Sequence, residues 1–126
     1  MPFLVKAGLV ELALGGLSGW LVVMTLERPD WLRRAHVRHP PRLRQAHLDW
    51  IMMGTILVAA GAAVPGIPDT IAALVVFGAY VNPALFVPLA FDAGTAQRLS
   101  FRVLTVVSFL AMSGGLTTLA VHGLTR

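Results

Sequence analysis

Four long apolar stretches dominate the sequence, and short polar or proline-containing segments separate them. They run from about residue 3 to 26, 47 to 64, 70 to 91 and 101 to 121. Each has roughly 18–24 residues, and a helix needs about 20 residues to cross the apolar core of a bilayer. Backbone groups in lipid must be hydrogen-bonded within the protein, so we expect helices here. The pattern therefore predicts an all-α integral membrane four-helix bundle, with residues 1–126 forming a single domain.

Composition supports this interpretation and excludes several classes of protein. Apolar residues make up 56% of the chain and charged residues only 13%, with a mean hydropathy of +0.75. Soluble domains are less apolar and carry roughly 25% charged residues, and disordered chains are more polar still. The sequence contains no cysteine. Disulfide scaffolds, thiolate metal sites and cysteine nucleophiles are therefore excluded.

The connections between the stretches differ in length and charge. Residues 65–69 and 92–97 are short turns, which place consecutive helices antiparallel, and Asp69 is expected to cap the third helix. The first connection, 27–46, is long and holds six of the ten basic residues, namely Arg28, Arg33, Arg34, Arg38, Arg42 and Arg44. The positive-inside rule predicts that this loop is cytoplasmic and that both termini lie outside, in a bacterial-type inner membrane. The first stretch has no cleavage site and is expected to be retained as a helix.

The arginines of this connection allow two interpretations. They set the topology and contact anionic lipid, or some of them clamp an anionic group such as a propionate or phosphate, which arginine binds bidentately. The connection contains a single aromatic residue, Trp31, and no recognised nucleic-acid module. We therefore expect a lipid bilayer as a partner and no nucleic acid.

His47 is the main chemical group at the start of the second stretch. Residues three, four and seven further on share its helix face, which reads His47, Trp50, Ile51, Gly54, Val58 and Gly61. An imidazole above two glycines suits a planar macrocycle with an axial histidine. The alternative is tight helix packing through small residues, with His47 at the interface. Asp49 points about 200° away from His47, toward a neighbouring helix or the lipid headgroups.

Two further polar groups fall inside predicted spans. Asn82 lies midway along the third stretch, on one face with Gly78 and Phe86, and Pro83 frees a backbone carbonyl near it. An amide in lipid needs a partner, either a neighbouring helix or a ligand. Glu11 in the first stretch is a lone membrane carboxylate, which either carries protons in a transporter or bonds to a neighbouring helix.

Two short motifs resemble those of small four-helix membrane isomerases typified by hydroxylaminobenzene mutase and, more distantly, styrene oxide isomerase. The first is Ala46-His47-Leu48-Asp49 followed by Gly54, and the second is Gly78, Tyr80 and Asn82 in the third stretch. The length, the four spans and the long first connection agree as well. The chain departs from these families at Met53 and Phe86, where they carry asparagine and tyrosine, and at Asp49, where they carry glutamate.

The resemblance implies a homo-oligomer, by analogy a trimer, that holds haem b with His47 as the axial ligand of the iron. In this interpretation Gly54 and Trp50 border the haem, and Arg42 and Arg44 hold its propionates. Asn82 orients the substrate, Tyr80 is a second donor, and Phe86, Met53 and Gly78 form the substrate pocket.

These residues lead to three functional hypotheses. The first is a membrane isomerase that rearranges a small apolar epoxide or arylhydroxylamine, with the ferric iron acting as a Lewis acid. The second is a small proton-coupled exporter that uses Glu11. The third is a non-catalytic haem-binding membrane component, which the loss of polar groups at Met53 and Phe86 favours.

Overall fold

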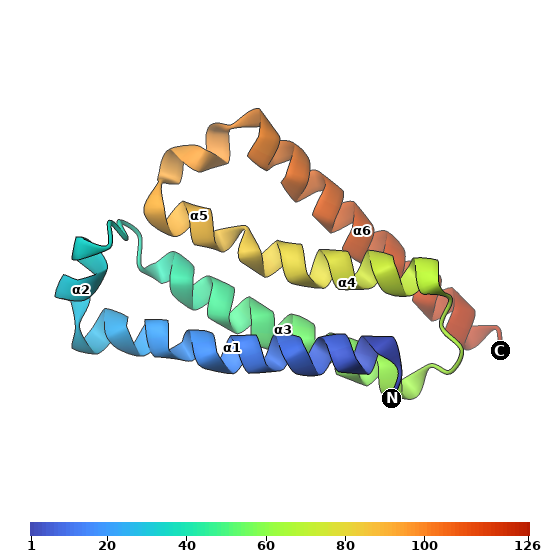
Figure 1. The fold of residues 1–126 in the computed structure, drawn as a ribbon. Helices are drawn as coiled ribbons and strands as arrows, with labels where there is room; N and C mark the ends of the chain where they lie inside the picture. The colour runs from blue at the N-terminus through green and yellow to red at the C-terminus, as the bar shows by residue number, and fades with distance from the viewer.

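The computed structural model describes all 126 residues and confirms the all-α architecture. The long helices are α1 (Phe3–Glu27), α3 (Pro41–Ala63), α4 (Asp69–Ala84) and α6 (Leu99–Leu124). Three shorter elements connect them, namely α2 (Pro29–Arg34), α5 (Phe86–Phe91) and the 3-10 helix η1 (Ala93–Gln97). Both termini lie at one end of the molecule, and α2, α5 and η1 gather at the other (Figure 1). We call the latter the loop end.

Four helical segments are long and apolar enough to cross a membrane, as the hydrophobic pattern predicts. They are Phe3–Glu27, Pro41–Ala63, Asp69–Phe91 and Leu99–Leu124. The second span begins at Pro41 rather than at residue 47, because a proline is favoured in the first helical turn. Asp69 is the first residue of α4 rather than its cap, and it makes no capping hydrogen bond.

The third span is interrupted where α4 gives way to α5 at Leu85. Pro83 and Pro88 lie on either side of this position and each removes a backbone donor from the helical ladder. The interruption lies next to Asn82, one of the two buried polar side chains of the α4–α6 contact.

Helix α1 packs against α3 along a seam of glycines. A Cβ atom added at Gly8 would lie 2.7 Å from Val58 Cγ2, and one at Gly15 would lie 2.8 Å from Ile51 Cγ1. Only glycine permits backbones to approach this closely. Helix α4 meets α6 in the same way, because a Cβ atom at Gly78 would lie 2.6 Å from that of Met112.

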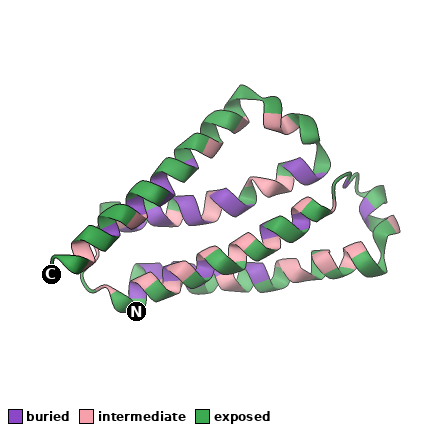
Figure 2. Ribbon diagram, turned by 180° about the vertical axis from the view of Figure 1, so that it is seen from behind, coloured by how far each residue is buried: buried purple, intermediate pink, exposed green.

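Helix α6 touches the rest of the protein along one side only. It makes close backbone contacts with α4 and η1 but none with α1 or α3. From its contact with α4 near the termini, α6 diverges from α4 and α5 toward the loop end (Figure 1). Exposed residues cover much of its surface (Figure 2). The four helices thus form a splayed bundle with a wedge-shaped space between α3, α5 and α6.

The 27–46 connection, expected to be a loop, is largely helical and folded onto α5. The backbone N–H groups of Arg38 and His39 both donate to the carbonyl oxygen of Ala90, at 2.9 and 2.8 Å. A small apolar core holds the segment in place, formed by Leu32, Val37, Leu43 and Ala90. Prolines at the first positions of α2 and α3 favour the helices.

One ion pair lies at the start of α2. Arg28 hydrogen-bonds Asp30 at 3.3 Å and lies 4.2 Å from the centre of the Trp31 ring. The guanidinium lowers the pKa of the Asp30 carboxyl below its ordinary value, chiefly through this hydrogen bond. Both groups are solvent-exposed, so the pair orders α2 locally and contributes little to the stability of the bundle.

Candidate functional site

The His47 side chain faces α1 and is held by backbone. Its Nδ1 atom lies 2.6 Å from the carbonyl oxygen of Gly15 and 3.2 Å from the hydroxyl oxygen of Ser18. A carbonyl can only accept, so Nδ1 carries the proton and donates it to Gly15. The other ring nitrogen, Nε2, then has a free lone pair, and it makes no hydrogen bond. Metal-binding histidines in proteins are typically oriented in this way.

The groove expected below His47 is closed, because α1 fills it. A Cβ atom at Gly54 would lie 2.9 Å from Leu12 Cγ, and one at Gly61 would lie 2.9 Å from Leu4 Cβ. The glycines on this face of α3 therefore form the α1–α3 seam, and Gly54 does not border an open groove. This corrects the expectation of a flat site along that face. The indole nitrogen of Trp50, on the same face, is buried and has no hydrogen-bond partner.

The two arginines proposed to hold propionates lie on different faces of α3. Arg44 precedes His47 by three residues, so the two share a face. It borders a shallow cavity of about 310 Å³ between the start of α3 and the last turns of α1. Arg42 instead donates to the side-chain oxygen of Gln45, at 3.0 Å. Of the pair, only Arg44 lies on the His47 side.

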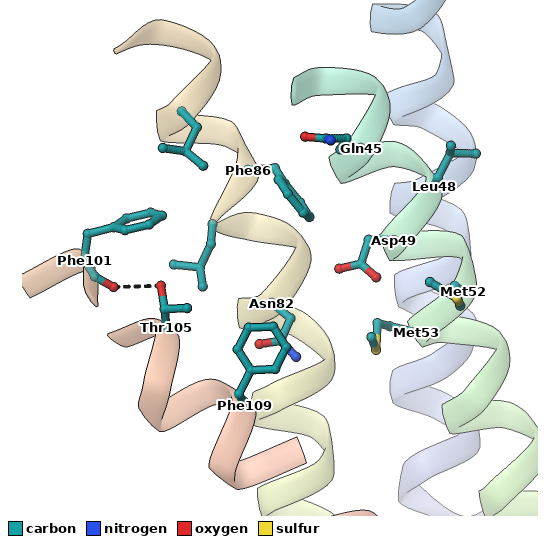
Figure 3. Close-up of a pocket in the computed structure, with 12 residues that line it drawn as sticks. Gln45, Leu48, Asp49, Met52, Met53, Asn82, Phe86, Phe101, Thr105 and Phe109 are labelled. Carbon is teal, nitrogen blue, oxygen red and sulfur yellow. Dashed lines mark hydrogen bonds between the residues drawn. The ribbon is translucent and has the colours of Figure 1, made fainter. Parts of the chain in front are cut away.

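The wedge at the loop end contains a cavity of about 570 Å³ (Figure 3). Apolar side chains make up most of its wall, and three of them are phenylalanines. Polar groups enter it from α3, α4 and α6. Its lining residues are Gln45, Leu48, Asp49, Met52, Met53, Asn82, Leu85, Phe86, Leu89, Phe101, Thr105 and Phe109. We call this space the wedge pocket.

Asn82 is a fixed polar group in the wall of this pocket. The hydroxyl of Ser108, on α6, donates to its side-chain oxygen at 2.5 Å, and both residues are buried. The amide nitrogen of Asn82 is turned toward α3 (Figure 3). Asn82 therefore presents hydrogen-bond donors to the pocket, while its oxygen accepts from Ser108. Sequence alone left open whether this amide joins helices or faces a ligand, and the structure shows that it contacts α6 and also lines the pocket.

Asp49 enters the pocket from the opposite wall. Its carboxylate is directed from α3 toward α4 and α5 (Figure 3). It forms no ion pair, and none of the side-chain hydrogen bonds of the chain involves it. From the sequence, Asp49 is expected to face a neighbouring helix or the lipid headgroups and not a ligand pocket. Its spacing of four residues from both Gln45 and Met53 was the available signal, because such residues share a helix face.

The other site residues predicted from the sequence divide between the pocket and the helix contacts. Phe86 and Met53 line the wedge pocket. Gly78, expected beside them, lies instead in the α4–α6 contact against Met112. The Tyr80 hydroxyl donates to the carbonyl oxygen of Ala7 at 2.6 Å, so this side chain reaches α1 and not the pocket. The hydroxyl that the resemblance assigns as a second donor to the substrate is thus bonded to α1.

Glu11 is a buried carboxylate that lies outside the wedge pocket. It has no exposed surface, and neither of its oxygens has a hydrogen-bond partner. It follows Ala7 by one turn of α1, close to where Tyr80 reaches that helix. Glu11 therefore belongs to the junction of α1 with α3 and α4 and does not line the pocket.

The imidazole and the pocket lie on different sides of α3. His47 faces α1, whereas Asp49 faces α4 and α5. One chain therefore does not bring His47 and Asn82 into one site. Comparison with known protein families, with curated proteins and with solved structures finds no match to this chain.

Proposed function

We propose that this protein is a membrane isomerase that binds haem b through His47 and rearranges a small apolar epoxide or arylhydroxylamine. The orientation of His47 carries this proposal. An interfacial histidine without a role would face water or lipid headgroups, whereas here Nδ1 is committed to the Gly15 carbonyl at 2.6 Å. That bond fixes the tautomer with an unprotonated Nε2, the form that binds iron.

The residues around His47 provide some of the groups that haem binding requires. The imidazole meets the requirement for an axial ligand, and Arg44 on the same face supplies a cation for a propionate. The glycine face offers no space, because α1 covers it. Haem held by His47 would thus have to be bordered by groups other than Gly54. We propose that a second copy of the chain supplies them, in keeping with the expected homo-oligomer.

When bound, ferric haem would supply a Lewis-acidic iron that stabilises negative charge on a substrate oxygen. The chain itself would contribute positioning and exclusion of water. Asn82, locked by Ser108, would donate a hydrogen bond to the substrate. Phe86 and Met53 would keep water from a cationic intermediate. In an oligomer the wedge pocket of one copy would face His47 of the next.

The test is an absorption spectrum of the protein purified in detergent and supplied with haem. We expect a Soret band for the wild type and for His39→Ala, which removes an exposed histidine at the loop end. His47→Ala should lose the band, because no other imidazole has its Nδ1 atom bonded to a backbone carbonyl. His122 approaches the Pro65 carbonyl through Nε2, at 3.4 Å. Added imidazole should restore it, which would show that the variant is folded. A wild type without a Soret band, or a band unchanged in His47→Ala, would overturn the proposal.

A further inference from the structure

The wedge pocket has features that haem binding at His47 does not use. It holds a single ionisable group, the Asp49 carboxylate, and no basic residue lines it. A carboxylate in a membrane-spanning helix is costly unless it is paired or faces a cavity. Asp49 has no partner within the chain, and its carboxylate points into the cavity. The pocket is therefore complementary to a positive charge.

The remaining walls of the pocket determine which apolar group the ligand can carry. Phe86, Phe101 and Phe109 come from α5 and α6 and surround the space opposite Asp49 (Figure 3). Aromatic faces attract cations and also pack against apolar rings. Asn82 turns its amide nitrogen, which is a donor, toward α3, and its oxygen already accepts from Ser108. Asp49 is thus the only charged acceptor for a cation in the pocket, and the ring faces add to the attraction.

The pocket lies between two of the predicted membrane-spanning helices, and no helix contact closes it on the side between α3 and α6. Helix α6 makes no close backbone contact with α3, the helix that carries Asp49. A molecule dissolved in the apolar core can therefore reach the space between these two helices from the side. This route suits a ligand that partitions into the membrane.

We propose that the wedge pocket binds a small lipophilic amine, with its ammonium group on the Asp49 carboxylate and its apolar body among the phenylalanine rings. The cavity of about 570 Å³ accommodates a molecule with one aromatic ring and a short amine-bearing chain. The proposed isomerase would place its substrate in the same pocket, but amine binding rests on Asp49 and requires neither His47 nor haem. Loss of the Soret band and loss of amine binding therefore test the two proposals separately.

The test measures saturable binding of radiolabelled 2-phenylethylamine to the detergent-solubilised protein at neutral pH, where the probe is a cation. Asp49→Asn should weaken binding roughly tenfold or more, because it removes the charged partner of the ammonium. Asp49→Glu should retain part of the affinity. Asp69→Asn, which removes an exposed carboxylate at the other end of the molecule, should bind like the wild type. The neutral analogue 2-phenylethanol should compete far more weakly than unlabelled amine.

Asp49 makes no hydrogen bond within the chain, so Asp49→Asn breaks none, and size-exclusion chromatography checks its fold. The proposal is overturned if the wild type shows no saturable binding or if Asp49→Asn binds as well as the wild type. Equal competition by 2-phenylethanol would identify the space as an apolar groove for lipid chains and would also overturn it. If Asp69→Asn lost as much affinity as Asp49→Asn, the loss would reflect the overall charge of the protein. This result would also overturn the proposal.

Discussion

Gly54 and Gly16 show how much the role of a residue depends on what faces it. Both are glycines within predicted membrane spans. A Cβ atom at Gly54 would meet Leu12 Cγ at 2.9 Å and the carbonyl oxygen of Gly8 at 3.1 Å, whereas one at Gly16 would meet nothing within 4 Å. The carbonyl is part of a helix and cannot yield as a flexible side chain can. The first glycine is thus required by close helix packing, and the second is not.

This difference gives a prediction at the residue scale. Gly54→Ala should destabilise the protein by about 1–3 kcal/mol through overpacking of the α1–α3 seam. Gly16→Ala should be neutral or stabilising by up to roughly 1 kcal/mol, because alanine is the better helix former. Thermal or denaturant unfolding in detergent measures both. Equal effects of the two substitutions would contradict the close packing of α1 against α3 at Gly54.

At the scale of elements, the 27–46 segment is an ordered unit attached to α5. Leu32 is 4% exposed, and together with Val37 and Leu43 it packs against Ala90. The paired hydrogen bonds to the Ala90 carbonyl join the same two elements. The segment thus positions α5, whose residues Phe86 and Leu89 line the wedge pocket. Its arginines are exposed, apart from Arg42, which is half-buried.

Removal of this apolar anchor should loosen the segment. Leu32→Ala should weaken the contact between the 27–46 segment and α5 by about 2–5 kcal/mol. Limited digestion with trypsin should then cut after Arg33, Arg34 or Arg38 several-fold faster than in the wild type, because local opening exposes the backbone. Leu99→Ala, at a residue 75% exposed near the same end, is the control and should be cut like the wild type. Unchanged cleavage in Leu32→Ala would show that the segment is held by other contacts.

On the scale of the whole molecule, the helices divide the chain into two ends with different charge. The 27–46 segment, Arg98 and Arg102 lie at the loop end, whereas the termini lie together at the other (Figure 1). Four membrane crossings require both termini to lie on one side. The positive-inside rule then predicts that the loop end faces the cytoplasm.

The absence of cysteine makes this orientation directly measurable. We expect Ala35→Cys to react with a membrane-impermeant maleimide only from the cytoplasmic side. Ala63→Cys and Thr125→Cys, both exposed near the other end, should react only from outside. The unsubstituted protein provides the blank. Labelling of positions 35 and 125 from the same side would exclude a four-span arrangement, and the reverse pattern would invert the predicted topology.

The amino-acid sequence by itself determined the fold class, the four spans and the division into a basic end and a terminal end. These follow from hydrophobic length and charge, which act locally along the chain. The resemblance to small membrane isomerases implied that Asn82, Phe86 and Met53 surround a substrate. In the structure these three residues line the wedge pocket.

Only the tertiary structure decided which face of each helix is covered. The sequence of the helix face with His47 and Gly54 is compatible with either a ligand or a neighbouring helix lying against it. The packing of α1 shows that a helix covers this face. Likewise, the reach of Tyr80 to Ala7 and the entry of Asp49 into the wedge depend on contacts between helices far apart in sequence. Periodicity assigns a side chain to a face, but the neighbour of that face is a property of the assembled bundle.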